Sequence, residues 1–243
     1  MHKLHVIPAL QDNYIWLLEN SDQQAIIIDP GESSPVINYI RQYKITPIAI
    51  LLTHHHMDHI GGVLDLQQNY PNIEVFGPSE IPLPIQYISN SQHHLSIADF
   101  QFSIMPVPGH TLGHLAYYSA PYLFCGDTLF SAGCGRIFEG TPQQMLNSLN
   151  KFKQLSDNTL VCAGHEFTKA NLKFAQTLLP EDLKIAEYLN LITNKTITLP
   201  SILAKELQIN LFLRCDNKKL QNKFNINNEL DLFVFFRSQK DIF

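Results

Sequence analysis

The sequence predicts a layered α/β protein followed by a small, mostly helical C-terminal domain. Apolar runs of strand length alternate with amphipathic helical patterns over the first two thirds of the chain, and only helical patterns remain from about residue 168. The charge changes sign at the same place, because six Lys and Arg stand against 14 Asp and Glu up to residue 167, and 11 against eight after it. We therefore expect two domains, residues 1–167 and 168–243, with different tasks.

The expected strands are continuous apolar segments, as in sheets that are buried on both faces. They lie at residues 25–31, 48–56, 102–110, 122–127 and 159–165. Helical spacing of apolar residues marks six further segments, at 34–44, 61–70, 141–155, 169–179, 180–192 and 200–210. In the third of these, Thr141 is the expected N-cap and Pro142 the first helical residue.

Length and composition limit the classes of function. The chain has 243 residues, 45% of them hydrophobic, which is enough for a sizeable core, and no apolar run approaches the roughly 18 residues of a membrane span. A net charge of −5 argues against a nucleic-acid partner, because neutralising phosphates requires a basic face. The start of the chain lacks the features of a secretion signal, and the four cysteines form no C-x-x-C pair and lie mostly in apolar runs, as buried reduced thiols do. We expect a cytoplasmic monomer that acts on a small molecule, without a membrane partner.

Candidate metal ligands stand at the ends of four of the five predicted strand segments. They are His54 and His56, His110, Asp127, and His165. Loops that leave one edge of a sheet bring residues that are distant in sequence together, and binding residues are usually found on such loops. We therefore expect these side chains to form one site, together with Asp58 and His59 of the first cluster.

The number of candidate ligands indicates two metal ions. His54 and His56 alternate along an extended segment, so they face the same way and can share one ion, whereas Asp58 and His59 follow a turn and can serve a second. Seven ligands exceed what one tetrahedral zinc ion uses, but two ions with three ligands each and one shared carboxylate account for all of them. Nitrogen and oxygen ligands without a thiolate suit zinc, with iron or manganese as alternatives.

Other titratable residues have less defined roles. Asp29 is explained equally well by the Pro30-Gly31 turn and by a role in orienting a metal ligand. Cys134 is expected to be a packing residue rather than a nucleophile. The remaining histidines outside the cluster are expected at the surface or in packing roles, namely His2, His5, His93, His94 and His114.

Four motifs give the chain a resemblance to the metallo-β-lactamase superfamily: "THHHMDHIGG", "PGHTLGH", "GDTLF" and "GHE". Within the superfamily it most resembles the glyoxalase II (hydroxyacylglutathione hydrolase) family, through "LQDNYIWLL", "GDTLFSAGCGRIFEGT", "GHEFTKANLKFA" and the terminal "FRSQKDIF". The resemblance runs nearly from end to end. It implies an αββα sandwich with a helical C-terminal domain.

The resemblance also implies an activity, namely the hydrolysis of S-D-lactoylglutathione to glutathione and D-lactate by a metal-bridging hydroxide, the second step of methylglyoxal detoxification. By position, His54, His56 and His110 would hold one metal ion, Asp58, His59 and His165 the other, and Asp127 would bridge both. Asp58 and Asp127 would be the catalytic carboxylates.

Substrate recognition is implied for five residues. Arg237 and Lys240 would approach the glycine carboxylate of glutathione, and Arg136 would line the same side. Spacing alone would make Arg237 and Lys240 part of a solvated terminus. Some members have tyrosine where this chain has Phe138 and Phe167, so ring packing is expected there without the hydroxyl hydrogen bonds.

Two alternatives stay open. A persulfide dioxygenase of the same superfamily would keep His54, His110 and Asp127 around one iron, but "GRIFEGT" and the terminal basic pair argue against it. A binding module that has lost activity would retain the fold, but the presence of all the expected ligands argues against that.

Overall fold

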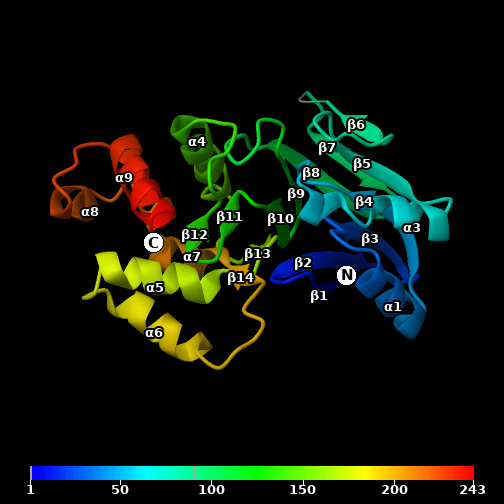
Figure 1. Cartoon of the computed structure of the whole chain (residues 1–243), viewed down its shortest axis with the longest axis horizontal. Coiled ribbons are helices and arrows are strands. Elements are labelled where there is room, and N and C mark those ends of the chain that lie inside the picture. The colour runs from blue at the N-terminus through cyan, green and yellow to red at the C-terminus, as the bar shows by residue number, and fades with distance from the viewer. Residues whose placement is uncertain (1, 90) are drawn as a thin grey trace. The chain divides into compact units, whose positions relative to one another are not determined.

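Two parallel strands, β3 (Gln24–Ile28) and β4 (Thr46–Leu51), lie at the centre of the first sheet in the computed structural model, which describes residues 2–89 and 91–243 (Figure 1). The strand order is β1-β2-β3-β4-β5-β6, with antiparallel pairs up to β3 and parallel pairs from β3 onward. The five predicted strands and six predicted helices are all present, with ends that shift by a few residues.

The chain forms two units, which are described separately below. The first comprises the residues up to Pro106, Gly113–Ser119 and Leu123–Gly126, and the second comprises Val107–Leu112, Ala120–Tyr122 and Asp127–Phe243. The remaining elements up to residue 126 are β1 (Lys3–Ala9), β2 (Asn13–Glu19), α1 (Ser34–Tyr43), α2 (Met57–Ile60), α3 (Val63–Asn69), β5 (Glu74–Pro78), β6 (Gln86–Ile88), β7 (His94–Ile97), β8 (Phe100–Pro106), β9 (Leu115–Ser119) and β10 (Tyr122–Gly126).

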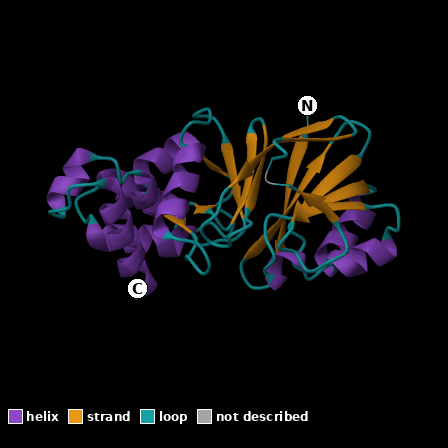
Figure 2. Cartoon of the chain, turned by 90° about the horizontal axis from the view of Figure 1, so that it is seen from above, coloured by secondary structure: helices purple, strands orange, loops and turns teal. Residues whose placement is uncertain are grey.

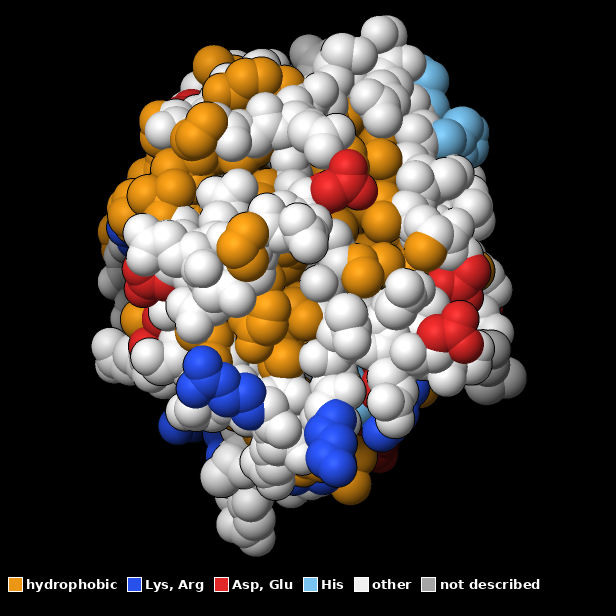
Figure 3. All heavy atoms as spheres, turned by 90° about the vertical axis from the view of Figure 1, so that its right-hand side faces the viewer, with side chains coloured by type: hydrophobic (Ala, Val, Ile, Leu, Met, Phe, Trp, Pro, Cys, Tyr) orange, Lys and Arg blue, Asp and Glu red, His pale blue; other side chains and the backbone are white. Residues whose placement is uncertain are grey.

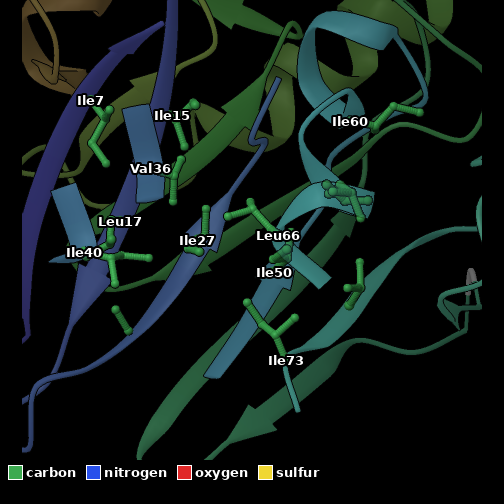
Figure 4. Close-up of a cluster of buried hydrophobic side chains, with 14 of the residues drawn as sticks. Ile7, Ile15, Leu17, Ile27, Val36, Ile40, Ile50, Ile60, Leu66 and Ile73 are labelled. Atoms are coloured by element: carbon green, nitrogen blue, oxygen red, sulfur yellow. The ribbon is translucent and has the colours of Figure 1, made fainter. Parts of the chain in front are cut away.

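A buried aliphatic cluster joins the first sheet to its helices (Figure 4). Ile27 and Ile50 of the central strands pack with Val36 and Ile40 of α1 and with Leu66 of α3. Each such side chain contributes about 1.5–3 kcal/mol when fully buried. The carboxyl ends of β3 and β4 therefore lie on a rigid base.

The strands β7 to β10 form a second layer of strands in the first unit, in the order β10-β9-β8-β7. β7 and β8 pair in antiparallel fashion, and their residues alternate between buried and exposed over much of their length. This alternation is typical of a sheet with one face on a core and the other toward solvent.

On the face drawn in Figure 3, Lys and Arg side chains gather mainly along the lower edge, and uncharged or hydrophobic side chains cover most of the surface.

The second unit is rich in helices, which Figure 2 draws around the end marked C. Its elements are β11 (Leu129–Phe130), β12 (Gly133–Cys134), α4 (Pro142–Phe152), β13 (Leu160–Ala163), α5 (Thr168–Leu178), α6 (Leu183–Ile192), β14 (Ser201–Ile202), α7 (Leu203–Ile209), the 3₁₀ turn η1 (Leu211–Leu213), α8 (Lys218–Lys223) and α9 (Glu229–Asp241). Among the described residues, no helix is long and apolar enough to cross a membrane.

Helix α4 starts as the sequence predicts. Thr141 accepts a hydrogen bond from the backbone N–H of Gln144, whose side chain accepts one from the Thr141 N–H. Pro142 occupies the first helical position. This reciprocal capping satisfies two donors that a helix start otherwise leaves open.

A buried carboxylate fixes the turn between β11 and β12. Glu206, on α7, is fully buried and accepts hydrogen bonds from the Ser131 hydroxyl at 2.6 Å and from the Ala132 backbone N–H at 2.7 Å. Asn210 donates from its side chain to the carbonyls of Phe130 and Gly133 on the same turn. The turn is thus held by side chains from the helical part of the chain.

Candidate metal centre and substrate pocket

The first group of candidate ligands lies where the parallel strands β3 and β4 end. Asp29 follows β3, and Thr53 and His54 follow β4, so parallel pairing brings them to one edge of the sheet. Asp29 has a φ of 52°, a left-handed conformation that Asp tolerates better than most residues. This conformation accompanies hydrogen bonds to its carboxylate from the Thr53 N–H at 2.8 Å and the Thr53 hydroxyl at 2.7 Å.

The Asp29 carboxylate sets the orientation of two histidine rings. Its Oδ2 atom lies 3.0 Å from Nδ1 of His59, and the Thr53 hydroxyl, which donates to the same oxygen, accepts from Nδ1 of His54 at 2.9 Å. Both rings then carry their proton on Nδ1 and present the lone pair of Nε2. The sequence left two interpretations of Asp29 open, a turn residue or a residue that orients a metal ligand. These contacts support the orienting role.

His54 and His56 lie together as ligands of one ion would. Nε2 of His54 is 3.1 Å from Nδ1 of His56. Two ligands of one tetrahedral zinc ion, with Zn–N bonds of about 2.0–2.1 Å, place their nitrogens roughly 3.3 Å apart. The two rings therefore fit a shared metal ion.

Asp58 and His59 form the neighbouring pair on the short helix α2. Oδ2 of Asp58 lies 3.6 Å from Nε2 of His59, the nitrogen that faces away from Asp29. Asn13, at the start of β2, donates from its amide to Oδ2 of Asp58 at 3.0 Å and to the Asp58 carbonyl at 3.2 Å. No role was expected for Asn13 from the sequence, although it lies in the "LQDNYIWLL" motif that carries the family resemblance.

Close packing holds this segment in place. A Cβ on Gly31 would overlap the Asp58 carbonyl oxygen, so a side chain there would displace the backbone that carries this candidate ligand. His114 is fully buried, and its ring stacks on that of His54 at 4.7 Å and 14°. It is therefore a packing residue, one of the two roles that the sequence predicted for it.

In the second unit, Asp127 lies near two histidines. Its Oδ2 atom is 3.4 Å from Nε2 of His110 and 3.3 Å from Nε2 of His165. Nδ1 of His110 donates to the Arg136 carbonyl at 2.7 Å, so the Nε2 lone pair of His110 faces the carboxylate. All three side chains are buried, and a carboxylate near two such nitrogens suits divalent cations.

A glycine is required beside this second group. A Cβ on Gly135 would overlap the Asp127 carbonyl oxygen and lie 3.2 Å from Nδ1 of His110. Any side chain at this position would therefore move Asp127 or His110.

Cys134 contributes packing rather than chemistry. Burial raises the pKa of its thiol to about 11, against an opposing effect of Arg237, so the thiol stays protonated at neutral pH. All four cysteines are buried free thiols, as predicted. The candidate ligands are consequently nitrogen and oxygen atoms.

The second unit also contains a pocket of about 240 Å³. Aromatic and basic side chains line it, together with three smaller ones: Phe130, Cys134, Arg136, Phe167, Ala170, Asn171, Arg237 and Lys240. Four of the five residues that the resemblance assigned to substrate binding are in this lining. The fifth, Phe138, is 61% exposed, and its ring meets that of His110 edge-on at 5.2 Å.

The aromatic wall of the pocket contacts a metal-ligand candidate. The ring of Phe167 stacks on His165, with centroids 4.8 Å apart and 5° between the planes. Phe130 meets the rings of His165 and Phe167 edge-on, at 5.8 Å and 5.1 Å. Phe130 and Asn171 also line the pocket, and no motif or spacing in the sequence predicted a role for either residue.

Two of the three basic side chains of the pocket belong to helix α9. Arg237 is only 8% exposed, donates from Nη1 to the Cys134 carbonyl at 3.0 Å, and lies 5.4 Å from the centroid of the Phe212 ring. The Lys240 ammonium lies 5.4 Å from the Phe174 ring centroid and 4.9 Å from that of Phe243. Neither residue belongs to a frayed terminus.

Two sequence families match consecutive parts of the chain. Residues 10–165 match the metallo-β-lactamase superfamily, and residues 166–243 match the hydroxyacylglutathione hydrolase C-terminus. Together the two matches span the chain from residue 10 to its end.

Full-length relatives agree with these matches. The chain is 51% identical to a hydroxyacylglutathione hydrolase of Pectobacterium atrosepticum, with 98% of each chain covered. It is 52% identical to those of Yersinia pseudotuberculosis and Hamiltonella defensa, with 98% and 100% of each chain covered.

Solved structures have the same fold. The BLEG-1 B3 metallo-β-lactamase is 30% identical, with a TM-score of 0.64 over 68% of this chain and 92% of that one. ETHE1 from Myxococcus xanthus is 21% identical, with a TM-score of 0.59 over 86% of this chain and 96% of that one. A Staphylococcus aureus metallo-β-lactamase is 18% identical, with a TM-score of 0.69 over 100% of this chain and 71% of that one. The expected α/β metallo-β-lactamase fold with a helical C-terminal domain is thereby confirmed.

Proposed function

Because the chain belongs to the hydroxyacylglutathione hydrolase (glyoxalase II) family of the metallo-β-lactamase superfamily, we propose that it hydrolyses S-D-lactoylglutathione to glutathione and D-lactate. The observation that carries the proposal is the match of residues 166–243 to the C-terminus of these hydrolases, combined with about 50% identity over the whole chain. The same proposal assigns metal binding to residues 1–167 and substrate binding chiefly to residues 168–243.

We further propose that the candidate ligands bind two divalent ions, with zinc expected and iron or manganese as alternatives. In this proposal His54, His56 and His110 would hold one ion, Asp58, His59 and His165 would hold the other, and Asp127 would be shared. The donor chemistry of each group supports this assignment, since the ring contacts of His54, His59 and His110 leave an Nε2 lone pair for a metal. When bound, the ions supply a water of lowered pKa as nucleophile and a Lewis acid for the developing oxyanion.

The chain's own residues have defined tasks in this reaction. Asp58 and Asp127 supply ligand oxygens, and Asp29, Thr53 and the Arg136 carbonyl keep the histidine protons on Nδ1. The leaving thiolate has a pKa of only about 8.5, so it departs without a dedicated general acid. The proposed reaction therefore needs no nucleophilic serine or cysteine.

Substrate binding is proposed for the basic pocket. Arg237 and Lys240 bind the glycine carboxylate of glutathione, and Arg136 lines the same side. Phe167 and Phe138 contact the peptide through their rings. The lack of tyrosine hydroxyls at Phe138 and Phe167 weakens glutathione binding by about 1 kcal/mol for each missing hydrogen bond. We propose that the protein is a monomer. We also propose that it is located in the cytoplasm, where buried thiols stay reduced and glutathione is present.

The test is metal analysis of the purified protein together with turnover of S-D-lactoylglutathione. We expect about two divalent ions per chain and release of one glutathione for each thioester consumed. Oxygen consumption on a glutathione persulfide, with one iron per chain, would instead identify the dioxygenase. Absence of both activities in metal-loaded protein would identify a binding module.

A further inference from the structure

Asp241 joins two arginines of the pocket. It is the last residue of α9, and its Oδ1 atom lies 3.1 Å from Nε and 2.9 Å from Nη2 of Arg237, one turn earlier on the same helix. The same oxygen accepts a hydrogen bond from Nε of Arg136 at 3.2 Å. Arg136 precedes Asp241 by 105 positions in the chain, so this contact links the β12 region to the C-terminal helix.

The two arginines depend on this carboxylate to different degrees. The Arg237 side chain is 10% exposed and is also held by the Cys134 carbonyl and the Phe212 ring. The Arg136 side chain is 54% exposed, and its side-chain hydrogen bonds to described residues both go to Asp241, to Oδ1 and to the backbone carbonyl. Loss of the Asp241 carboxylate would therefore return rotamer freedom chiefly to Arg136, because a long, exposed side chain is disordered unless its contacts hold it.

The charges around Asp241 give its carboxylate a further role. Arg136, Arg237 and Lys240 are three cations that line one pocket, and like charges at short range repel one another. One carboxylate oxygen shared by both guanidinium groups offsets this repulsion and leaves the pocket with a positive charge for an anionic ligand.

Arg237 keeps the capacity to bind such a ligand directly. A guanidinium group has five N–H donors. In Arg237, three of them face oxygen atoms of described residues and a further one faces Sγ of Cys134 at 3.8 Å. A donor therefore remains for a ligand carboxylate.

We propose that Asp241 is a positioning residue for substrate binding: its Oδ1 atom holds the guanidinium groups of Arg136 and Arg237 side by side, so that both bind the carboxylate of the substrate. The inference rests on the proposed function and deepens it. It makes the preference of the enzyme for thioesters that carry a carboxylate depend on Asp241, although the Asp241 carboxylate by itself repels carboxylates.

The test compares Asp241→Asn with the unsubstituted protein in the metal-loaded, full-length enzyme. Steady-state kinetics are measured with S-D-lactoylglutathione and with a small neutral thioester. We expect KM for the glutathione thioester to rise about 5- to 30-fold, with kcat within about threefold, because the lost contact is remote from the reacting carbonyl. The small thioester should show no change.

Three further variants make the test specific. Asp216→Asn removes the same charge from a more exposed carboxylate, which pairs with Lys153 in the same unit, so it should leave KM unchanged. Asp241→Glu keeps the charge and should recover part of the affinity. In an Arg136→Ala background, Asp241→Asn should raise KM by a smaller factor, because one of the two groups that it positions is already gone.

Several outcomes would overturn the proposal. An unchanged KM in Asp241→Asn would mean that the arginines need no carboxylate, and a lowered KM would mean that Asp241 competes with the substrate. Equal losses on both thioesters, with a lowered melting temperature, would show a structural role alone. If the unsubstituted protein does not turn over S-D-lactoylglutathione at all, the proposed function fails instead, and that result is distinct from each of the others.

Discussion

The carboxylate of Asp29 lies 3.0 Å from Nδ1 of His59, on the side of the ring opposite to the nitrogen that faces Asp58. The same carboxylate binds the Thr53 hydroxyl, which in turn contacts Nδ1 of His54. One side chain therefore determines which nitrogen two candidate histidine ligands present.

Replacing Asp29 with Ala should weaken metal binding about 10- to 100-fold, because both rings lose the contact that fixes their tautomer. Competition with a chromophoric chelator measures the affinity directly, without reference to turnover. Because the Asp29 carboxylate also binds the Thr53 N–H, the melting temperature of the metal-free variant must be measured in parallel. Unchanged metal affinity would mean that the rings are oriented by packing, with His114 as the foremost contact.

Replacing Asp127 with Ala should lower the metal content well below two ions per chain and abolish hydrolysis, since the proposed assignment makes its carboxylate the ligand common to both ions. Metal analysis after gel filtration and thioester turnover provide the two measurements. A variant that retains two tightly bound ions and near-normal turnover would contradict the shared role.

Replacing both Arg237 and Lys240 with Ala should raise KM for the glutathione thioester and leave kcat within a few fold. The expected loss of binding free energy is about 1–3 kcal/mol, as for charge-assisted contacts. The part of the loss that belongs to the half-buried Lys240 should shrink at high salt, because salt screens such a charge more than it screens the buried charge of Arg237. A small thioester without carboxylates serves as the control. An equal effect on that substrate would show that Arg237 and Lys240 have a structural role instead.

Lys240 should make ligand binding sensitive to alkaline pH. Burial lowers the pKa of its ammonium, the nearby charge of Arg237 lowers it further, and Asp241 opposes both. A lysine with a lowered pKa loses its charge at a lower pH than an ordinary lysine, whose pKa is about 10.4. A plot of the logarithm of the inhibition constant of S-methylglutathione against pH should therefore break upward at a pH below that value, whereas an ordinary lysine would place the break at about 10.4.

The matched variant for this pH profile is Lys240→Arg, because arginine keeps its charge throughout the range. The amino group of the inhibitor titrates equally in both experiments, so only the difference between the two profiles reports on Lys240. Identical profiles would show that the Lys240 charge does not contribute to binding.

The sequence predicted the elements whose patterns are local. β3 and β4 are parallel and buried toward their carboxyl ends, so they appear as continuous apolar runs, and α4 has a recognisable cap and proline. The two-residue strands β11 and β12 are too short for any periodicity. β1, whose sequence includes two polar residues and a proline, also lacks a clear run.

The same limit applies to the candidate site. The candidate ligands at the strand ends could be selected because each follows an apolar run, whereas Asn13 reaches Asp58 across 45 positions of sequence. Arg237 shows the difference most clearly: spacing placed it in a solvated terminus, but its contacts with Cys134 and Phe212 bury it. Long-range contacts of this kind leave no pattern in a single sequence.

The burial of Glu206 has a consequence for dissecting this enzyme into parts. Its carboxylate satisfies donors on the turn at Ser131 and Ala132, which follows Asp127 closely in sequence and leads to Cys134 of the pocket. A chain truncated after residue 167 would leave those buried donors without acceptors, at a cost of about 1–3 kcal/mol each. The helical segment is thus an internal scaffold for the turn that follows Asp127, and an autonomous minimal hydrolase would need a redesigned turn before the tail could be removed.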